Sequence, residues 1–173
     1  CLELLLSPGD RLLVDQPTYP NALEAARRVG ARLVAAPLAP QGWDVEGIAA
    51  TVRQTSPRAA YVIPEFHNPT GLLMPTEVRS EVARALAGSR TLAIVDETLV
   101  DLALDAVPMP APFATHASRG RVITVGSSAK SFWGGLRTGW IRADATMVLR
   151  LAAVRAAIDL STAVLEQVVV LHL

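Results

Sequence analysis

Short apolar runs alternate with segments of helical spacing along most of this 173-residue chain. Alternation of this kind predicts an α/β fold, with helices on both faces of a mostly parallel sheet in a three-layer α/β/α arrangement. The apolar runs predict strands at Arg11–Asp15, Arg32–Ala36, Ala59–Ile63, Leu92–Val95, Arg121–Val125 and Gly139–Arg142. The intervening periodicity predicts helices at Asn21–Val29, Val45–Gln54, Thr76–Ala87 and Ala145–Ile158, with another from Ser161.

Capping and turn residues mark several of these boundaries. Asp44 and Asp144 each precede a predicted helix, where a carboxylate can accept a hydrogen bond from the first turn. Thr76 is the expected N-cap of the helix Thr76–Ala87. Gly30 is expected to end the helix Asn21–Val29. The segment Pro37–Trp43 is predicted to be a loop.

Composition narrows the functional classes. Lys plus Arg and Asp plus Glu each number 16, so the formal net charge is zero and no nucleic-acid surface is indicated. The single cysteine, Cys1, excludes an internal disulfide and fits a reducing compartment, so a cytoplasmic location is expected. The three histidines do not have metal-ligand spacing. No apolar run reaches the ~18 residues of a membrane span.

Lys130 follows a predicted strand in the segment Gly126–Gly139, where small hydroxyl residues and glycines flank it. A lysine in such a place can hold an aldehyde cofactor as a Schiff base. Ser127 and Arg137 lie on either side of it, and a short hydroxyl with a planar guanidinium suits a phosphate group. Each residue also has a plainer interpretation: a surface lysine, a turn serine and a salt-bridged arginine.

Three more polar residues follow other predicted strands. A carboxylate such as Asp96, at the end of an apolar strand, needs a partner, and a protonated ring nitrogen would be one. Asn68, within the turn His67–Gly71, can donate a hydrogen bond to a phenolate oxygen. Tyr19 can stack on an aromatic cofactor. Each residue also has a purely structural alternative: Asp96 as a helix cap or salt-bridge partner, Asn68 as part of a bare turn, and Tyr19 as a core tyrosine. The neighbouring Glu97 is expected to form a structural pair.

Ligands of parallel sheets bind beyond the carboxyl ends of the strands. All of these candidate residues follow predicted strands, so together they indicate a ligand site more strongly than any one of them does alone. The set resembles the class I/II aminotransferases of pyridoxal phosphate (PLP) fold type I. The matching motifs occur in the order of that family, from about Leu2 to the C-terminus: Pro17-Thr18-Tyr19-Pro20-Asn21, Asn68-Pro69-Thr70-Gly71, Asp96-Glu97, and Ser127-x-x-Lys130 with Gly135-Leu136-Arg137-x-Gly139.

The resemblance implies a PLP-dependent aminotransferase, which moves an amino group between an amino acid and a 2-oxo acid and is typically a homodimer. It implies that Lys130 forms the Schiff base with PLP and later shuttles a proton, while Asp96 holds the pyridinium nitrogen and Asn68 bonds the ring O3′. Three further residues complete the implied site, namely the ring-stacking Tyr19 and the phosphate ligands Ser127 and Arg137.

The chain departs from the family pattern at Thr98, where the family usually has a tyrosine that also bonds O3′. The glycine-rich phosphate turn is expected before Cys1, and the small domain with its carboxylate-binding arginine after Leu173. Residues 1–173 are therefore expected to be part of a PLP-binding large domain, inactive when isolated.

Pro64–Met74 and Asp96–Leu99 look most like the aminotransferase-like domains of MocR-type GntR regulators. In those proteins a DNA-binding winged helix precedes a PLP domain that senses a ligand. The alternative function implied is therefore an effector domain that binds PLP and an amino acid or amine ligand with little turnover. In that case DNA contact would belong to a separate N-terminal domain, and no membrane contact is expected under either interpretation.

Overall fold

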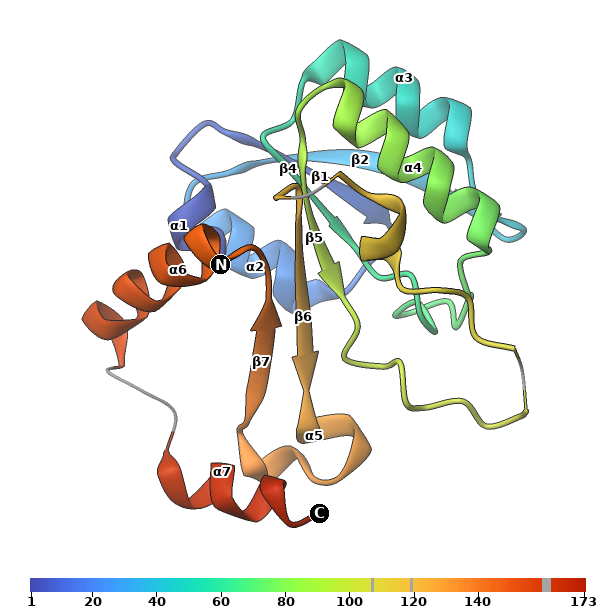
Figure 1. Ribbon diagram of the computed structural model, residues 1–173. Coiled ribbons are helices and arrows are strands. Elements are labelled where there is room, and N and C mark those ends of the chain that lie inside the picture. Colours follow the sequence, from blue (N-terminus) through green and yellow to red (C-terminus); the bar gives the residue numbers. More distant parts are fainter. Residues whose placement is uncertain (107, 119, 160–162) are drawn as a thin grey trace.

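A twisted seven-stranded sheet forms the middle layer of the computed structural model, which describes residues 1–106, 108–118, 120–159 and 163–173 (Figure 1). Across these residues the strand order is β3-β2-β1-β4-β5-β6-β7. The inner strands are parallel, and β3 and β7 pair antiparallel at the two edges. The strands are β1 (Arg11–Gln16), β2 (Arg32–Ala39), β3 (Gly42–Trp43), β4 (Ala59–Val62), β5 (Leu92–Asp96), β6 (Val122–Ser127) and β7 (Gly139–Arg142).

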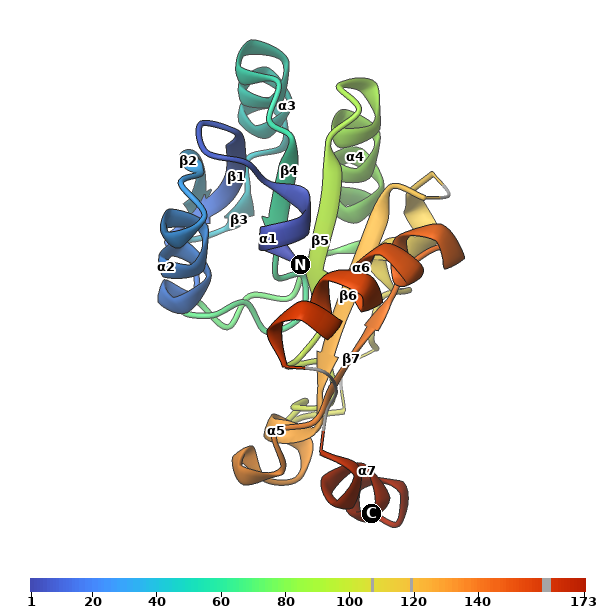
Figure 2. The ribbon, with the colours of Figure 1, turned by 90° about the vertical axis from the view of Figure 1, so that its left-hand side faces the viewer.

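Helices cover both faces of this sheet, which confirms the predicted three-layer α/β/α arrangement (Figure 2). Helices α3 (Val45–Thr55) and α4 (Thr76–Gly88) pack on one face. Helices α1 (Leu2–Leu5), α2 (Pro20–Arg28) and α6 (Ala145–Ile158) lie on the other. The remaining helical elements are α5 (Ser128–Ser131), α7 (Val164–Leu171) and the 3₁₀ turns η1 (Phe113–His116) and η2 (Gly134–Leu136).

The strands have two apolar faces because successive side chains point to opposite sides of the sheet. In β1, Leu12 and Val14 enter the core beneath α1 and α2, whereas Leu13 packs on the α3/α4 side. Every residue of β4 is buried. This double burial explains why the strands read as continuous apolar runs rather than as alternating ones.

Two local predictions were wrong. Pro37–Trp43 is not all loop, because β2 continues to Ala39 and β3 turns back on it, pairing Leu38 with Trp43. The positive φ of Gly42 permits the turn, and Trp43 is buried in the core, which stabilises it. Thr76 is not an N-cap: it is the first residue of α4, and Pro75 precedes it without a side-chain cap.

Other boundaries agree with the sequence. The carboxylate of Asp44 accepts a hydrogen bond from Gly47 N at 3.0 Å, and that of Asp144 accepts one from Met147 N at 3.1 Å. Gly30 follows α2 with φ +72°. The predicted helix start at Ser161 lies outside the described residues, and α7 begins at Val164.

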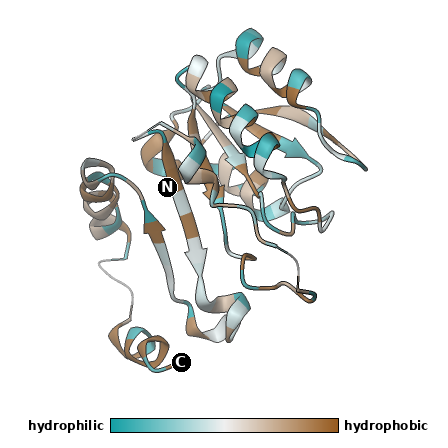
Figure 3. Ribbon diagram, turned by 45° about the vertical axis from the view of Figure 1, so that its right-hand side comes forward, coloured by the Kyte–Doolittle hydropathy of each residue, from teal (hydrophilic) through white to brown (hydrophobic). Residues whose placement is uncertain are grey.

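Helices α6 and α7 are rich in hydrophobic residues (Figure 3). Many of these apolar side chains are exposed. Leu149 is 71 % exposed on α6, and Leu165 and Leu171 are 73 % and 81 % exposed on α7. Within the described part of the chain, no helix is both long and apolar enough to cross a membrane.

Candidate functional site

The six predicted site residues gather at one edge of the sheet. Asp96 and Ser127 are the last residues of β5 and β6. Tyr19 lies just beyond the end of β1, and Asn68 lies in the loop that follows β4. Because β1, β4, β5 and β6 are parallel neighbours, their carboxyl ends share an edge. Two further candidates, Lys130 in α5 and Arg137 after η2, follow β6 at the same edge.

Asp96 is the best-defined member of this group. Its Oδ2 accepts a hydrogen bond from the Tyr61 hydroxyl at 2.5 Å, and its Oδ1 accepts one from the Thr98 backbone N–H at 3.0 Å. The side chain is half-buried, and no cation forms an ion pair with it among the residues that the structure describes. An ionised carboxylate has about four lone-pair directions, so Asp96 keeps acceptor capacity for a further donor.

Tyr61 is a site neighbour that the sequence analysis did not single out. It lies in β4, is 9 % exposed, and has a pKa raised first by burial and then by the negative charge of Asp96. Its phenol therefore stays protonated and acts as a hydrogen-bond donor. The signal that could have revealed it is simple: a tyrosine inside a fully buried strand needs a partner for its hydroxyl.

Tyr19 and Asn68 lie in two loops that are joined beneath the site. Tyr19 as a residue is half-buried, and its hydroxyl accepts a hydrogen bond from Asn21 Nδ2 at 2.8 Å. The residue before Asn68 is His67, which is fully buried and has its Nε2 3.5 Å from Asp15 Oδ2 at the end of β1. This contact links the strand that precedes Tyr19 to the loop that carries Asn68.

The small-residue loop after β6 is less enclosed. Ser127 Oγ accepts a hydrogen bond from Ala129 N at 3.1 Å, as the cap of α5. Arg137 has φ +51° and is exposed, and Lys130 is exposed as well. In the described ranges, neither basic side chain forms an ion pair. Both therefore remain available for an anionic or carbonyl ligand.

Glu97 forms the structural pair expected of it: its Oε2 lies 3.9 Å from Arg142 Nη2. Burial raises the pKa of Glu97, and the attraction of Arg142 and of Arg79 only partly offsets this. This side chain therefore contributes to the support of the sheet edge, and no contact within the described residues draws it toward the candidate site.

A buried ion pair supports the loop that carries Asn68. Arg79 of α4 is fully buried and donates to Glu65 Oε1 at 2.5 Å and to the Met74 carbonyl at 2.8 Å. Burial raises the pKa of Glu65, although Arg79 opposes this effect. The sequence analysis singled out neither Glu65 nor Arg79, because the two residues are 14 positions apart and lack a local pattern.

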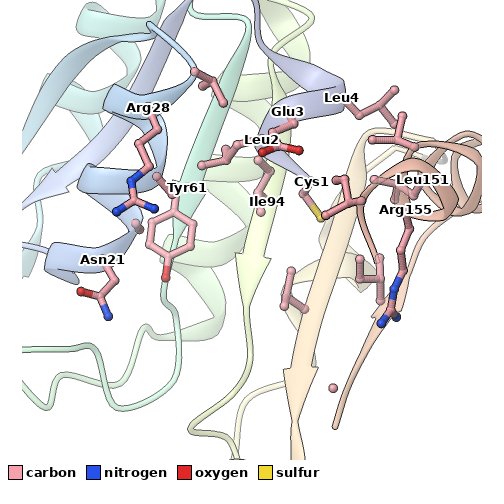
Figure 4. A pocket seen from close by; sticks show the side chains of 18 of the residues that line it. Cys1, Leu2, Glu3, Leu4, Asn21, Arg28, Tyr61, Ile94, Leu151 and Arg155 are labelled. Carbon is pink, nitrogen blue, oxygen red and sulfur yellow. The ribbon is translucent and has the colours of Figure 1, made fainter. Parts of the chain in front are cut away.

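A cavity of about 1100 Å³ lies between α2, the sheet and α6 (Figure 4). Tyr61 and Ile94 point into it from the sheet, and Leu151 and Arg155 border it on α6. Of the six candidates, Tyr19 lines this cavity and the other five do not. Tyr61, which lines the cavity, donates its hydroxyl hydrogen bond to Asp96 and so connects the cavity wall to that candidate.

The family model for aminotransferase class I and II matches residues 1–172. Among curated proteins, the chain is 31% identical to the HTH-type transcriptional regulator YdfD of Bacillus subtilis, over 94% of this chain and 34% of that protein. It is 28% identical to the 2-aminoadipate transaminase of Thermus thermophilus, over 97% of this chain and 43% of the enzyme.

Solved structures of similar fold include LysN, the alpha-aminoadipate aminotransferase of Thermus thermophilus, complexed with N-(5′-phosphopyridoxyl)-L-leucine. The TM-score is 0.86 at 27% identity, covering 98% of this chain and 45% of that one. The kynurenine aminotransferase of Pyrococcus horikoshii gives a TM-score of 0.88 at 26% identity, covering 97% and 44%. The chain thus spans less than half the length of each of these relatives.

Proposed function

Because the chain belongs to the class I and II aminotransferase family, we propose that it is the cofactor-binding part of a PLP-dependent aminotransferase. The reaction would move an amino group between an amino acid and a 2-oxo acid. The observation that carries this proposal is Asp96, a half-buried carboxylate at the end of a central strand. Two neutral donors hold it, and it lacks a cationic partner in the described part of the chain.

The chemistry of the donor set fits PLP. The carboxylate of Asp96 would accept a hydrogen bond from the protonated ring nitrogen, and the amide of Asn68 would donate one to the ring O3′. The Tyr19 ring would stack on the cofactor ring in an offset arrangement, which aromatic pairs favour. The hydroxyl of Ser127 and the guanidinium of Arg137 would bind the phosphate.

When bound, PLP supplies an electron sink for the negative charge that develops at the substrate Cα. The residues of the chain would perform the remaining tasks. Asp96 would keep the ring nitrogen protonated by offering it a fixed negative charge. Lys130 Nζ would hold the cofactor covalently and, once released by an amino acid, accept the proton that leaves Cα.

Lys130 is the only lysine in the sequence, whereas the other 15 of the 16 basic residues are arginines. A Schiff base between PLP and a lysine side chain of this sequence can therefore form only at Lys130. The full-length protein loaded with PLP should show a visible absorbance band, and borohydride should fix the cofactor to the peptide that contains Lys130. Lys130→Ala should lose both signals. A borohydride-reducible band that persists in Lys130→Ala would falsify the proposal.

A second candidate function is a PLP-binding effector domain of a MocR/GntR-type regulator with little or no turnover. The observation that favours it is the similarity to HTH-type transcriptional regulators, including YdfD and YisV of Bacillus subtilis. Loaded full-length protein should be incubated with amino acids and 2-oxo acids. Keto-acid-dependent turnover supports the enzyme. PLP binding without turnover, together with ligand-dependent binding to DNA, supports the regulator.

Four further properties belong to the same proposal. Residues 1–173 would form part of the large domain, and the substrate carboxylate would be bound by a residue of the small domain. The full-length protein would be a homodimer, with the exposed apolar faces of α6 and α7 covered. Its location would be cytoplasmic, consistent with a single cysteine that is exposed.

A further inference from the structure

Tyr61 and Asp96 come from adjacent parallel strands and meet on one face of the sheet. Tyr61 is in register with Ile94, and Asp96 lies two positions beyond Ile94 on β5. Side chains two positions apart in a strand point to the same face, so Asp96 emerges on the side that Tyr61 occupies. The Tyr61 hydroxyl spans the remaining gap and donates to Asp96 Oδ2 at 2.5 Å.

We propose that Tyr61 is a positioning residue for the cofactor aspartate, which fixes the Asp96 carboxylate so that its free lone pairs face the ring nitrogen. The inference rests on the proposed PLP function and deepens it. A carboxylate on a single flexible χ1/χ2 pair can rotate. Hydrogen bonds to both oxygens, from Tyr61 and from the Thr98 backbone N–H, remove that freedom before any ligand binds.

The competing interpretation is that Tyr61 is an ordinary core tyrosine, and that its hydrogen bond to Asp96 only satisfies the buried hydroxyl. Three observations favour positioning. Among the described residues, Asp96 forms no ion pair, and Tyr61 is the one side chain that donates a hydrogen bond to it. Burial and the charge of Asp96 raise the pKa of Tyr61, so the phenol remains a donor and does not compete for the proton. The aromatic ring packs in the core with Ile94 and Ile123, which fixes where the hydroxyl points.

The test uses Tyr61→Phe, which keeps the ring and its packing but removes the donor. A hydrogen bond to a charged acceptor contributes enough that its loss should weaken PLP affinity about 10-fold in the full-length protein. The affinity is measured by titrating apoprotein with PLP and following the visible absorbance. The second readout is the ¹⁵N NMR shift of the ring nitrogen of bound ¹⁵N-labelled PLP, which should move toward that of the unprotonated ring.

Thr91→Val is the matched control. Thr91 is also buried and donates its hydroxyl to the Pro57 carbonyl at 2.8 Å, without contact to Asp96. Thr91→Val should lower the free energy of unfolding by about as much as Tyr61→Phe does, and it should leave both the PLP affinity and the ¹⁵N shift unchanged. A double variant with Asp96→Asn adds a coupling test: with the carboxylate gone, removing the Tyr61 hydroxyl should have little further effect on affinity.

The outcomes separate the two proposals. If wild-type protein binds no PLP, the proposed function fails and this inference fails with it. If wild type binds PLP while Tyr61→Phe shows an affinity within twofold of it and an unchanged ¹⁵N shift, only the role of Tyr61 is overturned. Equal losses in Tyr61→Phe and Thr91→Val would also overturn it, because stability alone would then account for the effect.

Discussion

His67 Nε2 lies 3.5 Å from Asp15 Oδ2, and this contact joins the loop after β4 to the end of β1. The His67 side chain is completely buried, and its Nδ1 lies 2.9 Å from Thr70 Oγ1 within the Asn-Pro-Thr-Gly turn. Asp15 precedes the segment that carries Tyr19, and His67 precedes Asn68. One buried polar contact thus links the two loops that would hold the cofactor ring.

His67→Leu should lower the free energy of unfolding by about 1–3 kcal/mol, because Asp15 would keep a buried carboxylate without its polar neighbour. Urea unfolding followed by circular dichroism measures this change. Asp15→Asn combined with His67→Leu is the control, since it removes the stranded charge. The double variant should therefore lose less than the sum of the two single variants. Additivity within about 0.5 kcal/mol would show that the two side chains do not interact.

Arg79→Lys should destabilise the protein by about 2–4 kcal/mol although it keeps the positive charge. The planar guanidinium of Arg79 reaches Glu65 Oε1 and the Met74 carbonyl at the same time, and an ammonium cannot reproduce that fork. Arg84→Lys, on the exposed side of the same helix, should change stability by less than about 0.5 kcal/mol. Similar melting temperatures for the two variants would contradict the role given to Arg79.

The sequence predicted what local chemistry determines. Asp44 and Asp144 cap their helices because an N-cap depends on residues a few positions apart. The strand ends that carry the site were found because doubly buried strands are apolar at every position. The β2–β3 pairing was missed because its stability comes from burying Trp43, a tertiary contact.

The polar contacts beneath the site join residues that are far apart in the sequence, so no local sequence pattern indicates them. Tyr61 and Asp96 are 35 residues apart, and Asp15 and His67 are brought together only when β1 and β4 pair. A pattern of sequence spacing cannot reveal such pairs. What the sequence does supply is the requirement that each buried polar group find a partner, and this requirement points to Tyr61 and His67 as residues to follow.

Glu97 should make stability depend on pH. Its pKa is raised above the ordinary 4.5 by burial, so the folded state binds the proton more tightly than the unfolded state does. This contribution to stability is complete below pH 4.5 and is lost as the pH rises through the raised pKa. Glu97→Gln should therefore flatten the fall in unfolding free energy from about pH 4 upward, measured by urea titrations at several pH values.

The control for Glu97 is Glu46→Gln. Glu46 is exposed on α3, so its replacement should leave the slope in place. Glu65 is buried with the same direction of pKa shift and should account for part of the slope that remains in Glu97→Gln. An unchanged slope in Glu97→Gln would mean that this side chain reaches water in solution.

Asp96→Asn should release PLP more readily than wild type does. Asparagine keeps the shape and an oxygen acceptor, yet it removes the negative charge that would hold the ring nitrogen protonated. Loss of a charged partner costs about 1.5–3 kcal/mol, so the PLP dissociation constant should rise about 10- to 100-fold. Asp101→Asn is the matched control, because Asp101 is an exposed carboxylate that accepts a hydrogen bond from Ser131 Oγ close to Lys130. Dialysis followed by absorbance measures retention in both variants. If the two lose PLP equally, the effect reflects general charge near Lys130, and Asp96 is not the partner of the ring nitrogen.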